Sequence, residues 1–195
     1  MNKTVNRVEE ILTAADALLT GHFLYASGRH GDKYMQCAKV QQYPEYMEEI
    51  AKTVAKGFEG VKVDYVLAPA VGGIVFGYEL ARQLKARAVF TERVEGKMVL
   101  RRGFELPVGT KVVVAEDVIT TGGTVIEVIE VAKSMGADVV GAGSIVDRSG
   151  GKVDLGVKTV AALTTDIVSY APEECPLCKQ GIPVVKPGSR GATPV

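Results

Sequence analysis

Histidine, cysteine and net charge are all scarce in this sequence of 195 residues. It contains two histidines and three cysteines, and its 23 lysines and arginines are balanced by 23 aspartates and glutamates. The charge balance leaves no whole-protein field that would draw the chain to nucleic acid or to an anionic membrane, so any anion site must be local. No Ser–His or Cys–His pair is apparent, and we expect no nucleophilic side chain in catalysis. The odd cysteine count makes a poor disulfide framework and favours a reducing compartment.

Long apolar runs and internal repeats are also missing. No stretch approaches the roughly 20 apolar residues of a membrane-spanning helix, and the first ten residues lack the apolar core of a signal peptide. We therefore expect a cytoplasmic protein with no membrane partner. The length and the 47% of apolar residues are sufficient for one domain with a sizeable core.

The spacing of apolar residues predicts alternating helices and strands. Helices are expected at 5–19, stopped by Gly21, at 44–58, after the turn at 69–73 to about 85, and at 125–135, with strands at 63–67, 88–91, 112–114, 139–146 and 159–163. This alternation is typical of an α/β fold with a mainly parallel sheet covered on both faces. The Pro- and Gly-rich tail 172–195 is expected to form an extended arm across the domain or a partner subunit.

The most informative segment runs from Lys111 to Thr124. A β-branched strand ends in two carboxylates, Glu116 and Asp117, and is followed by Thr-Thr-Gly-Gly-Thr and a helix. Ligands of α/β sheets bind at such strand-to-helix turns. The glycines let the backbone approach a ligand, while the threonine hydroxyls and the free amides of the helix favour a phosphate. The carboxylates suit a ribose diol or a divalent cation. The alternative, an acidic turn that caps a helix, needs only one such residue.

This segment resembles the phosphoribosyl-diphosphate signature of type I phosphoribosyltransferases: four apolar, two acidic and two apolar residues, then Thr-Thr-Gly-Gly-Thr. The resemblance implies the type I fold, with a mainly parallel central sheet flanked by helices and a small N-terminal hood. We expect a single domain over 1–195, with the hood at about 1–40 and a C-terminal arm from about 170. The implied phosphoribosyl-diphosphate contacts are Glu116, Asp117, Val118, Ile119, Thr120, Thr121, Gly122, Gly123 and Thr124, together with Val71, Gly72 and Gly73. The implied cofactor is Mg²⁺, bound mainly through the substrate diphosphate and not by a metal site of the protein.

The turn Pro69-Ala-Val-Gly-Gly73 is the second part of the expected site. In the family it cradles the diphosphate through backbone amides, often with a strained peptide bond. Many related enzymes place a lysine where this chain has Gly72, so the contact is expected to be made by the backbone alone. A dinucleotide-binding interpretation of the same glycines is weak, because Gly72 and Gly73 followed by Gly77 miss the usual spacing.

Two segments resemble orotate phosphoribosyltransferases in particular. Residues 22–34 contain the Phe-Leu, Ser-Gly and Tyr pattern of the hood over the base, although Ala26 stands where many members have lysine. Residues 144–150 end a strand in Asp-Arg. The resemblance implies orotate contacts by Ser27, Thr120 and Arg148. A guanidinium suits that role because its planar fork binds a carboxylate at two points; alone, Arg148 would be interpreted as a solvent-facing arginine.

Residues 91–103 are basic, polar and contain two glycines. They resemble the mobile catalytic loop of the family, which reaches the diphosphate of the neighbouring subunit and makes the homodimer the active unit. Arg93 and Lys97 are the best matches to its catalytic cations, with Arg101 and Arg102 as alternatives. The family loop also carries a histidine, which is missing here. An ordinary exposed hairpin is the competing interpretation.

Together these resemblances imply that orotate and phosphoribosyl diphosphate give orotidine 5′-phosphate and diphosphate, a step of pyrimidine nucleotide synthesis. A purine phosphoribosyltransferase would share the signature but lack the Ser-Gly hood. A non-catalytic regulator that senses phosphoribosyl diphosphate is the other alternative, but it usually adds a nucleic-acid-binding element, and the first 20 residues are too few for a winged helix.

Cys175-Pro-Leu-Cys178 allows three interpretations: half of a zinc site, a redox pair or a structural turn. Zinc needs further ligands, and the histidines available are His22 and His30. Two chains of a dimer could also contribute one pair each. A turn or an opportunistic disulfide is favoured over zinc from the sequence.

Overall fold

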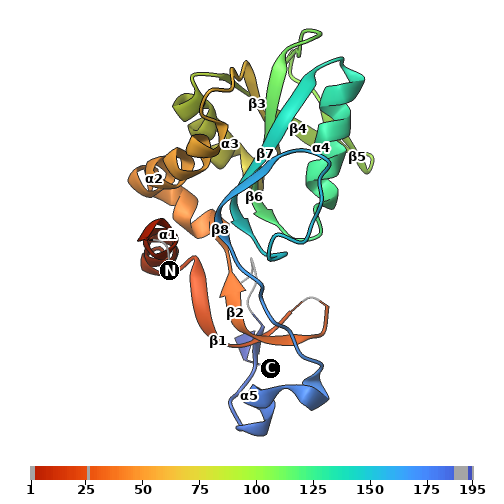
Figure 1. Cartoon of the computed structure of the whole chain (residues 1–195). Helices are drawn as coiled ribbons and strands as arrows, with labels where there is room; N and C mark the ends of the chain where they lie inside the picture. Colours follow the sequence, from red (N-terminus) through yellow and green to blue (C-terminus); the bar gives the residue numbers. More distant parts are fainter. Residues whose placement is uncertain (1–2, 26, 187–192, 195) are drawn as a thin grey trace.

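The computed structural model describes residues 3–25, 27–186 and 193–194, and its centre is a six-stranded sheet (Figure 1). The strands follow the order β5-β4-β3-β6-β7-β8. Their bounds are β3 Tyr65–Pro69, β4 Arg87–Val94, β5 Lys97–Leu100, β6 Lys111–Ile119, β7 Asp138–Asp147 and β8 Thr159–Thr164. Neighbouring strands are parallel except β4 and β5, which form an antiparallel hairpin at the edge. The predicted mainly parallel α/β sheet is confirmed.

Helices cover both faces of this sheet. One face packs against α1 (Lys3–Ala14), α2 (Pro44–Ala55) and α3 (Gly72–Leu84), and the other against α4 (Gly123–Ser134). Along β6 the side chains alternate between the two cores: Val113 points to α2 and α3, whereas Val112 and Val114 point to α4. Because both faces are covered, the central strands are apolar on both sides. Among the described residues, no helix is long and apolar enough to cross a membrane.

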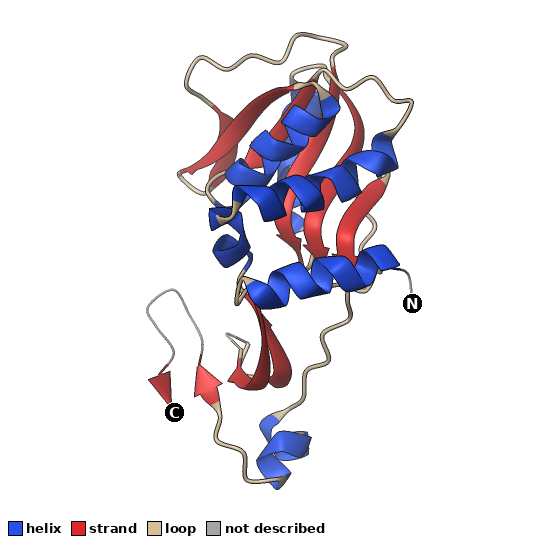
Figure 2. Ribbon diagram, turned by 90° about the vertical axis from the view of Figure 1, so that its left-hand side faces the viewer, coloured by secondary structure: helices blue, strands red, loops and turns tan. Residues whose placement is uncertain are grey.

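A small second sheet forms the hood, which we define as residues 18–35 and 170–186. It pairs β1 (Leu18–Leu24) with β2 (His30–Met35) antiparallel, and β9 (Val185–Lys186) lies parallel to β1 on its other side. The short strand β10 (Thr193–Pro194) pairs with β9. Two short helices, η3 (Pro172–Glu174) and α5 (Pro176–Lys179), precede β9. Figure 2 shows this small sheet and α5 below the main sheet and its helices.

The expected helix at 5–19 was wrong in its last five residues. The α-helix ends at Ala14, because Asp16 takes a left-handed conformation (φ 51°) and Ala17 donates back to the carbonyl of Leu12. Leu18 and Leu19 then enter β1, where Leu19 faces Tyr34 of β2. Pairing with β2 outweighs the helical spacing of the leucines, as tertiary contacts often do.

The tail that is expected to form a C-terminal arm is described as far as Lys186 and again at residues 193–194. Residues 172–186 contain two helical turns and β9, and they lie against the hood. The remaining tail residues 187–192 and 195 lie outside the described residues, as does Ala26. The second to fourth helices and the five expected strands are found at or near their predicted positions.

Candidate active site

Strand β6 places the acidic pair. It continues to Ile119, five residues beyond the predicted end, so Glu116 and Asp117 lie inside the strand and not in the turn that follows. Glu116 pairs with Ser144 of β7 in the sheet and is buried, whereas Asp117 is half-buried. The carboxylates are therefore held by the most central strand of the sheet, at its carboxyl end.

The turn after β6 forms a polar hollow. Its lining runs from Glu116 through Thr120, Thr121, Gly122, Gly123 and Thr124 to the first turn of α4. Gly122 is left-handed (φ 79°), and a Cβ there would lie 2.6 Å from Cγ1 of Val153. The position therefore demands glycine for both its backbone and its packing. Since α4 begins at Gly123, its first amides lack helical partners and favour an anion in this hollow.

The two glycine-containing turns meet at the acidic pair. A Cβ on Gly72 would lie 2.9 Å from Oδ2 of Asp117, and one on Gly73 would lie 3.3 Å from Oε1 of Glu116. The peptide bond between Ala70 and Val71 is cis. The structure thus brings together the two turns that the sequence analysis assigned to phosphoribosyl diphosphate.

Gln41 supports this junction and was not found from the sequence. Its Nε2 donates a hydrogen bond to the carbonyl oxygen of Gly72 at 2.9 Å. Gln41 belongs to η1 (Cys37–Gln42), which follows the hood hairpin. No motif marks it, because its role depends on a contact 31 residues away.

Burial shifts the pKa of Glu116 in the acidic pair. Removal from water, reinforced by the charge of Asp117, raises the pKa of Glu116 to about 8. The backbone N–H of Asp117 donates to Oε1 of Glu116 at 3.1 Å. Near neutral pH Glu116 therefore holds a proton and is able both to donate and to accept a hydrogen bond at a ribose diol.

Arg148 follows β7 beside the turn at residues 120–124, which we call the signature turn. Its backbone N–H donates to the carbonyl of Ile119 at 2.8 Å, which ties the end of β7 to the start of that turn. The buried carboxylate of Asp147 shapes the next residues by accepting from the backbone and hydroxyl of Ser149 at 2.8 and 2.7 Å. In the part of the chain that the structure describes, the buried Nε of Arg148 has no hydrogen-bond partner. A buried, unpaired guanidinium donor at this position suits an acceptor on a substrate.

The hood approaches Arg148 through Tyr25. Burial raises the pKa of the Tyr25 hydroxyl, and the nearby charge of Arg148 opposes that rise. This hydroxyl donates to the carbonyl of Lys33 at 2.5 Å, so the ring is fixed against β2. Ser27 lies on the exposed turn beyond it, where Gly28 is left-handed. Its predicted contact with orotate stays a prediction.

Comparison with known proteins decides the family. The model of the family described as "Phosphoribosyl transferase domain" matches residues 38–175. An orotate phosphoribosyltransferase of Desulforamulus reducens is 54% identical over 191 residues, which cover 97% of this chain and 100% of that protein. The chain belongs to the orotate phosphoribosyltransferase family. The family member of Thermotoga maritima is 53% identical, over 94% of this chain and 98% of its own length.

Solved structures of the family agree with the fold. The crystal structure of orotate phosphoribosyltransferase from Aeropyrum pernix superposes with a TM-score of 0.66 at 26% identity, covering 80% of this chain and 93% of that one. Adenine phosphoribosyltransferase from Thermoanaerobacter pseudethanolicus gives a TM-score of 0.60 at 19% identity, over 80% and 99% of the two chains. That second likeness extends to the fold alone, so the base preference has to come from other evidence.

The segment that resembles the catalytic loop of orotate phosphoribosyltransferases is largely a hairpin. Arg93 lies in β4 and Lys97 begins β5, both exposed, with a turn at Glu95 and Gly96 between them. Arg93 donates to the carbonyl of Gly96 at 2.7 Å and to a carboxylate oxygen of Glu127 in α4 at 2.6 Å. The local structure is that of the exposed-hairpin interpretation, and the catalytic role of both cations stays a prediction.

The hairpin nevertheless stands at the edge of the sheet that carries the site. Thr91 of β4 pairs with Pro69 of β3, and the carbonyl of Thr91 accepts from the N–H of Ala70. The hairpin therefore continues past the carboxyl end of β3, next to the turn at residues 69–73. The alternative cation Arg102 forms a two-point ion pair with Glu92 at 2.8 and 2.9 Å.

Glu116 should give the protein an unusual dependence of stability on pH. In the unfolded chain its carboxyl titrates near about 4.3, and in the fold near about 8. Between these values the folded state keeps a proton that the unfolded state releases, so the free energy of unfolding falls as pH rises. Relative to Glu116→Gln, the wild type should lose about 1 kcal/mol per pH unit and level off above about pH 8.

Urea unfolding of both proteins between about pH 5 and about pH 9 measures this difference. The exposed Glu105 supplies the matched control, because Glu105→Gln should track the wild type at every pH. A constant difference between wild type and Glu116→Gln across that range would show that the carboxyl titrates normally.

Proposed function

We propose that the chain transfers the phosphoribosyl group of phosphoribosyl diphosphate to orotate, giving orotidine 5′-phosphate and diphosphate. The observation that carries this proposal is Arg148, whose Nε has no hydrogen-bond partner among the described residues and whose backbone N–H donates to Ile119 at the start of the signature turn. A carboxylate-bearing pyrimidine supplies the acceptor that this donor needs. The sequence relationship to orotate phosphoribosyltransferases supports the same base.

In this proposal the chain acts by positioning and charge stabilisation. The hollow at residues 120–124 holds the 5′-phosphate, Glu116 and Asp117 bind the ribose hydroxyls, and the amides at Gly72 and Gly73 face the diphosphate. The close approach of Gly72 to Asp117 places these subsites side by side. Fixing both substrates in register lowers the entropic part of the barrier without a covalent intermediate.

The residues present fit Mg²⁺ that enters on the substrate. The carboxylate of Asp117 supplies hard oxygen donors, and Mg²⁺ is commonly bound by one or two carboxylates together with substrate phosphates. Among residues 3–25, 27–186 and 193–194, no further His, Cys, Asp or Glu joins Glu116 and Asp117 in a metal-binding group. These residues would hold the ion beside the diphosphate, where its charge would be available to stabilise the leaving group.

The assay that tests the function is the loss of orotate absorbance when phosphoribosyl diphosphate and Mg²⁺ are added to the purified chain. Parallel reactions contain adenine, hypoxanthine or xanthine. We expect turnover of orotate alone. Turnover of a purine in place of orotate would agree with the proposed phosphoribosyl subsites but overturn the assignment of Arg148. No turnover with any base would favour a non-catalytic regulator.

We also propose that the active unit is a homodimer in which Arg93 and Lys97 reach the diphosphate of the partner subunit. An apolar stripe supports this assembly: Val71 caps the start of α3, Val75 and Tyr78 lie on the helix, and the three side chains are 82%, 45% and 68% exposed. Val71 precedes Gly72 directly, so a partner on this stripe would lie beside the diphosphate turn. Sedimentation that shows only monomers at assay concentration would exclude this part of the proposal.

A further inference from the structure

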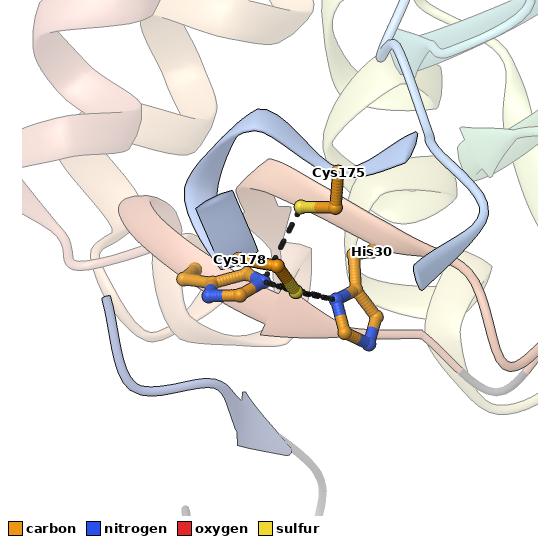
Figure 3. Close-up of side chains that lie close together, drawn as sticks. His30, Cys175 and Cys178 are labelled. Carbon is orange, nitrogen blue, oxygen red and sulfur yellow. Dashed lines mark hydrogen bonds between the residues drawn. The ribbon is translucent and has the colours of Figure 1, made fainter. Parts of the chain in front are cut away.

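Four potential metal ligands converge at the hood, away from the proposed transfer site. His22 comes from β1, His30 from β2, and Cys175 and Cys178 flank the first residues of α5. One ligand atom from each side chain lies within 4.8 Å of all the others. Figure 3 shows Cys175, Cys178 and His30 pointing toward a common centre, although residues 30 and 175 are far apart in the sequence.

The distances between these atoms are those of a small tetrahedron. Nε2 of His22 lies 3.0 Å from Nδ1 of His30 and 3.5 and 3.7 Å from the sulfurs of Cys175 and Cys178, and the Cys178 sulfur lies 3.2 Å from Nδ1 of His30. Zinc bonds of about 2.0 Å to nitrogen and about 2.3 Å to sulfur give tetrahedral edges of about 3.3 Å between nitrogens and about 3.5 Å between nitrogen and sulfur. We propose that His22, His30, Cys175 and Cys178 bind one structural Zn²⁺ ion.

The surroundings of the cluster favour the metal-binding form of His22. Its Nδ1 lies 2.7 Å from the carbonyl oxygen of Ile182, which can only accept, so Nδ1 carries the proton and Nε2 directs its lone pair at the cluster. A backbone carbonyl in this position is the usual support for a zinc-bound imidazole. Two thiolates offset the charge of Zn²⁺, so the site is neutral overall, which suits its three buried ligands.

A closed site with four protein ligands has a structural role, because no position is left for a substrate or water. The hood needs such a cross-link. Neither η3 nor α5 buries a residue, and β9 meets β1 at a single pair, Phe23 and Val185. Two further contacts hold the segment: the bridge of two backbone hydrogen bonds between His30 and Tyr170, and the hydrogen bond from His22 to the carbonyl of Ile182. Zinc therefore binds the later hood residues to the β1–β2 hairpin.

This assignment replaces the preference for a turn or a disulfide that the Cys-x-x-Cys pattern gave alone. A disulfide between Cys175 and Cys178 would leave Nε2 of His22 and Nδ1 of His30 facing each other with no metal ion to bind. All four zinc ligands come from one chain, so a second subunit is not needed to complete the site.

Metal analysis of the full chain tests the proposal. The protein is produced in zinc-supplemented medium without a metal-affinity tag, desalted and analysed by mass spectrometry for metals. We expect about one zinc per chain in the wild type and in Cys37→Ala, and less than about a tenth of that in Cys175→Ser/Cys178→Ser. Cys37 is the matched control because it is buried in the main core, outside the cluster.

Replacement of zinc by Co²⁺ gives a readout that needs no variant. The wild type should show the visible bands of tetrahedral Co²⁺ and a thiolate-to-cobalt charge-transfer band, and chelator treatment should lower Tm and expose residues 170–186 to protease. Wild-type protein without zinc, or of mass two hydrogens lower before reduction, would overturn the proposal, as would zinc retained by the double variant. None of these readouts depends on orotate turnover, so they stand apart from the test of the proposed function.

Discussion

Replacement of Arg148 by alanine should lower kcat/KM for orotate by about 100- to 1,000-fold, which corresponds to about 3 to 4 kcal/mol of lost binding in the transition state. The guanidinium lies beside the signature turn with a buried Nε that has no partner among the described residues. Truncation removes the group that pairs with the orotate carboxylate and leaves that carboxylate unpaired. Because the phosphoribosyl contacts are elsewhere, the affinity for phosphoribosyl diphosphate should remain nearly unchanged.

Initial rates with each substrate varied in turn measure this effect. Arg148→Lys keeps the charge but loses the planar fork, so its loss should be intermediate. Arg87→Ala is the matched control, since Arg87 lies at the amino end of β4 and bonds the hydroxyl of Tyr65 at 3.1 Å. Unchanged kcat/KM in Arg148→Ala would mean that this side chain faces solvent and that the base is recognised by other residues.

Gly122→Ala should damage both stability and activity. The left-handed backbone costs a non-glycine residue about 1 to 2 kcal/mol, and the new methyl would lie 2.6 Å from Cγ1 of Val153 and 2.8 Å from Cδ2 of Leu155. Overpacking of this kind adds about 1 to 3 kcal/mol. Relief of the clash must shift the turn that is proposed to hold the 5′-phosphate, and a displacement near 1 Å costs about 100-fold in rate.

The variant Gly109→Ala separates the effect of backbone strain from the effect of steric overlap by the new methyl group. Gly109 is also left-handed (φ 77°), but a Cβ there would meet nothing within 4 Å, and the residue lies before β6, at the opposite end of the strand from the site. It should lose a similar backbone contribution to the free energy of unfolding and retain full kcat/KM. Equal kinetic losses in both variants would contradict the phosphate role of the turn at residues 120–124.

The main sheet could be predicted from the sequence because its signals are local. The buried strands β3 and β6 are short apolar runs that end at glycine-containing turns, and α2 begins at Pro44 as predicted. Errors arose where a distant segment decides the structure. Leu19 belongs to a strand because it pairs with Tyr34 of β2, 15 residues later.

The residues of the candidate site also differ in whether the sequence alone could identify them. The signature turn could be found because its residues are consecutive and each has its own chemical reason. Gln41 and Tyr25 could not, since they contribute through contacts with Gly72 and with the neighbourhood of Arg148 that only the fold creates. The cysteine spacing of the proposed zinc site was visible, but its union with two histidines about 150 residues earlier was not. The cytoplasmic location and the homodimer stay predictions.

The two parts of the hood are synthesised at different times, because they are far apart in the sequence. Its hairpin, residues 18–35, is synthesised before the main sheet, whereas β9 and two of the four proposed zinc ligands follow only after residue 170. In between, the whole six-stranded sheet is made, and chains fold from the N-terminus as they emerge. The sheet with its signature turn therefore assembles before the hood is completed. A chain truncated before residue 170 would carry the proposed phosphoribosyl subsites but lack the later half of the hood, which is the proposed cover for the base.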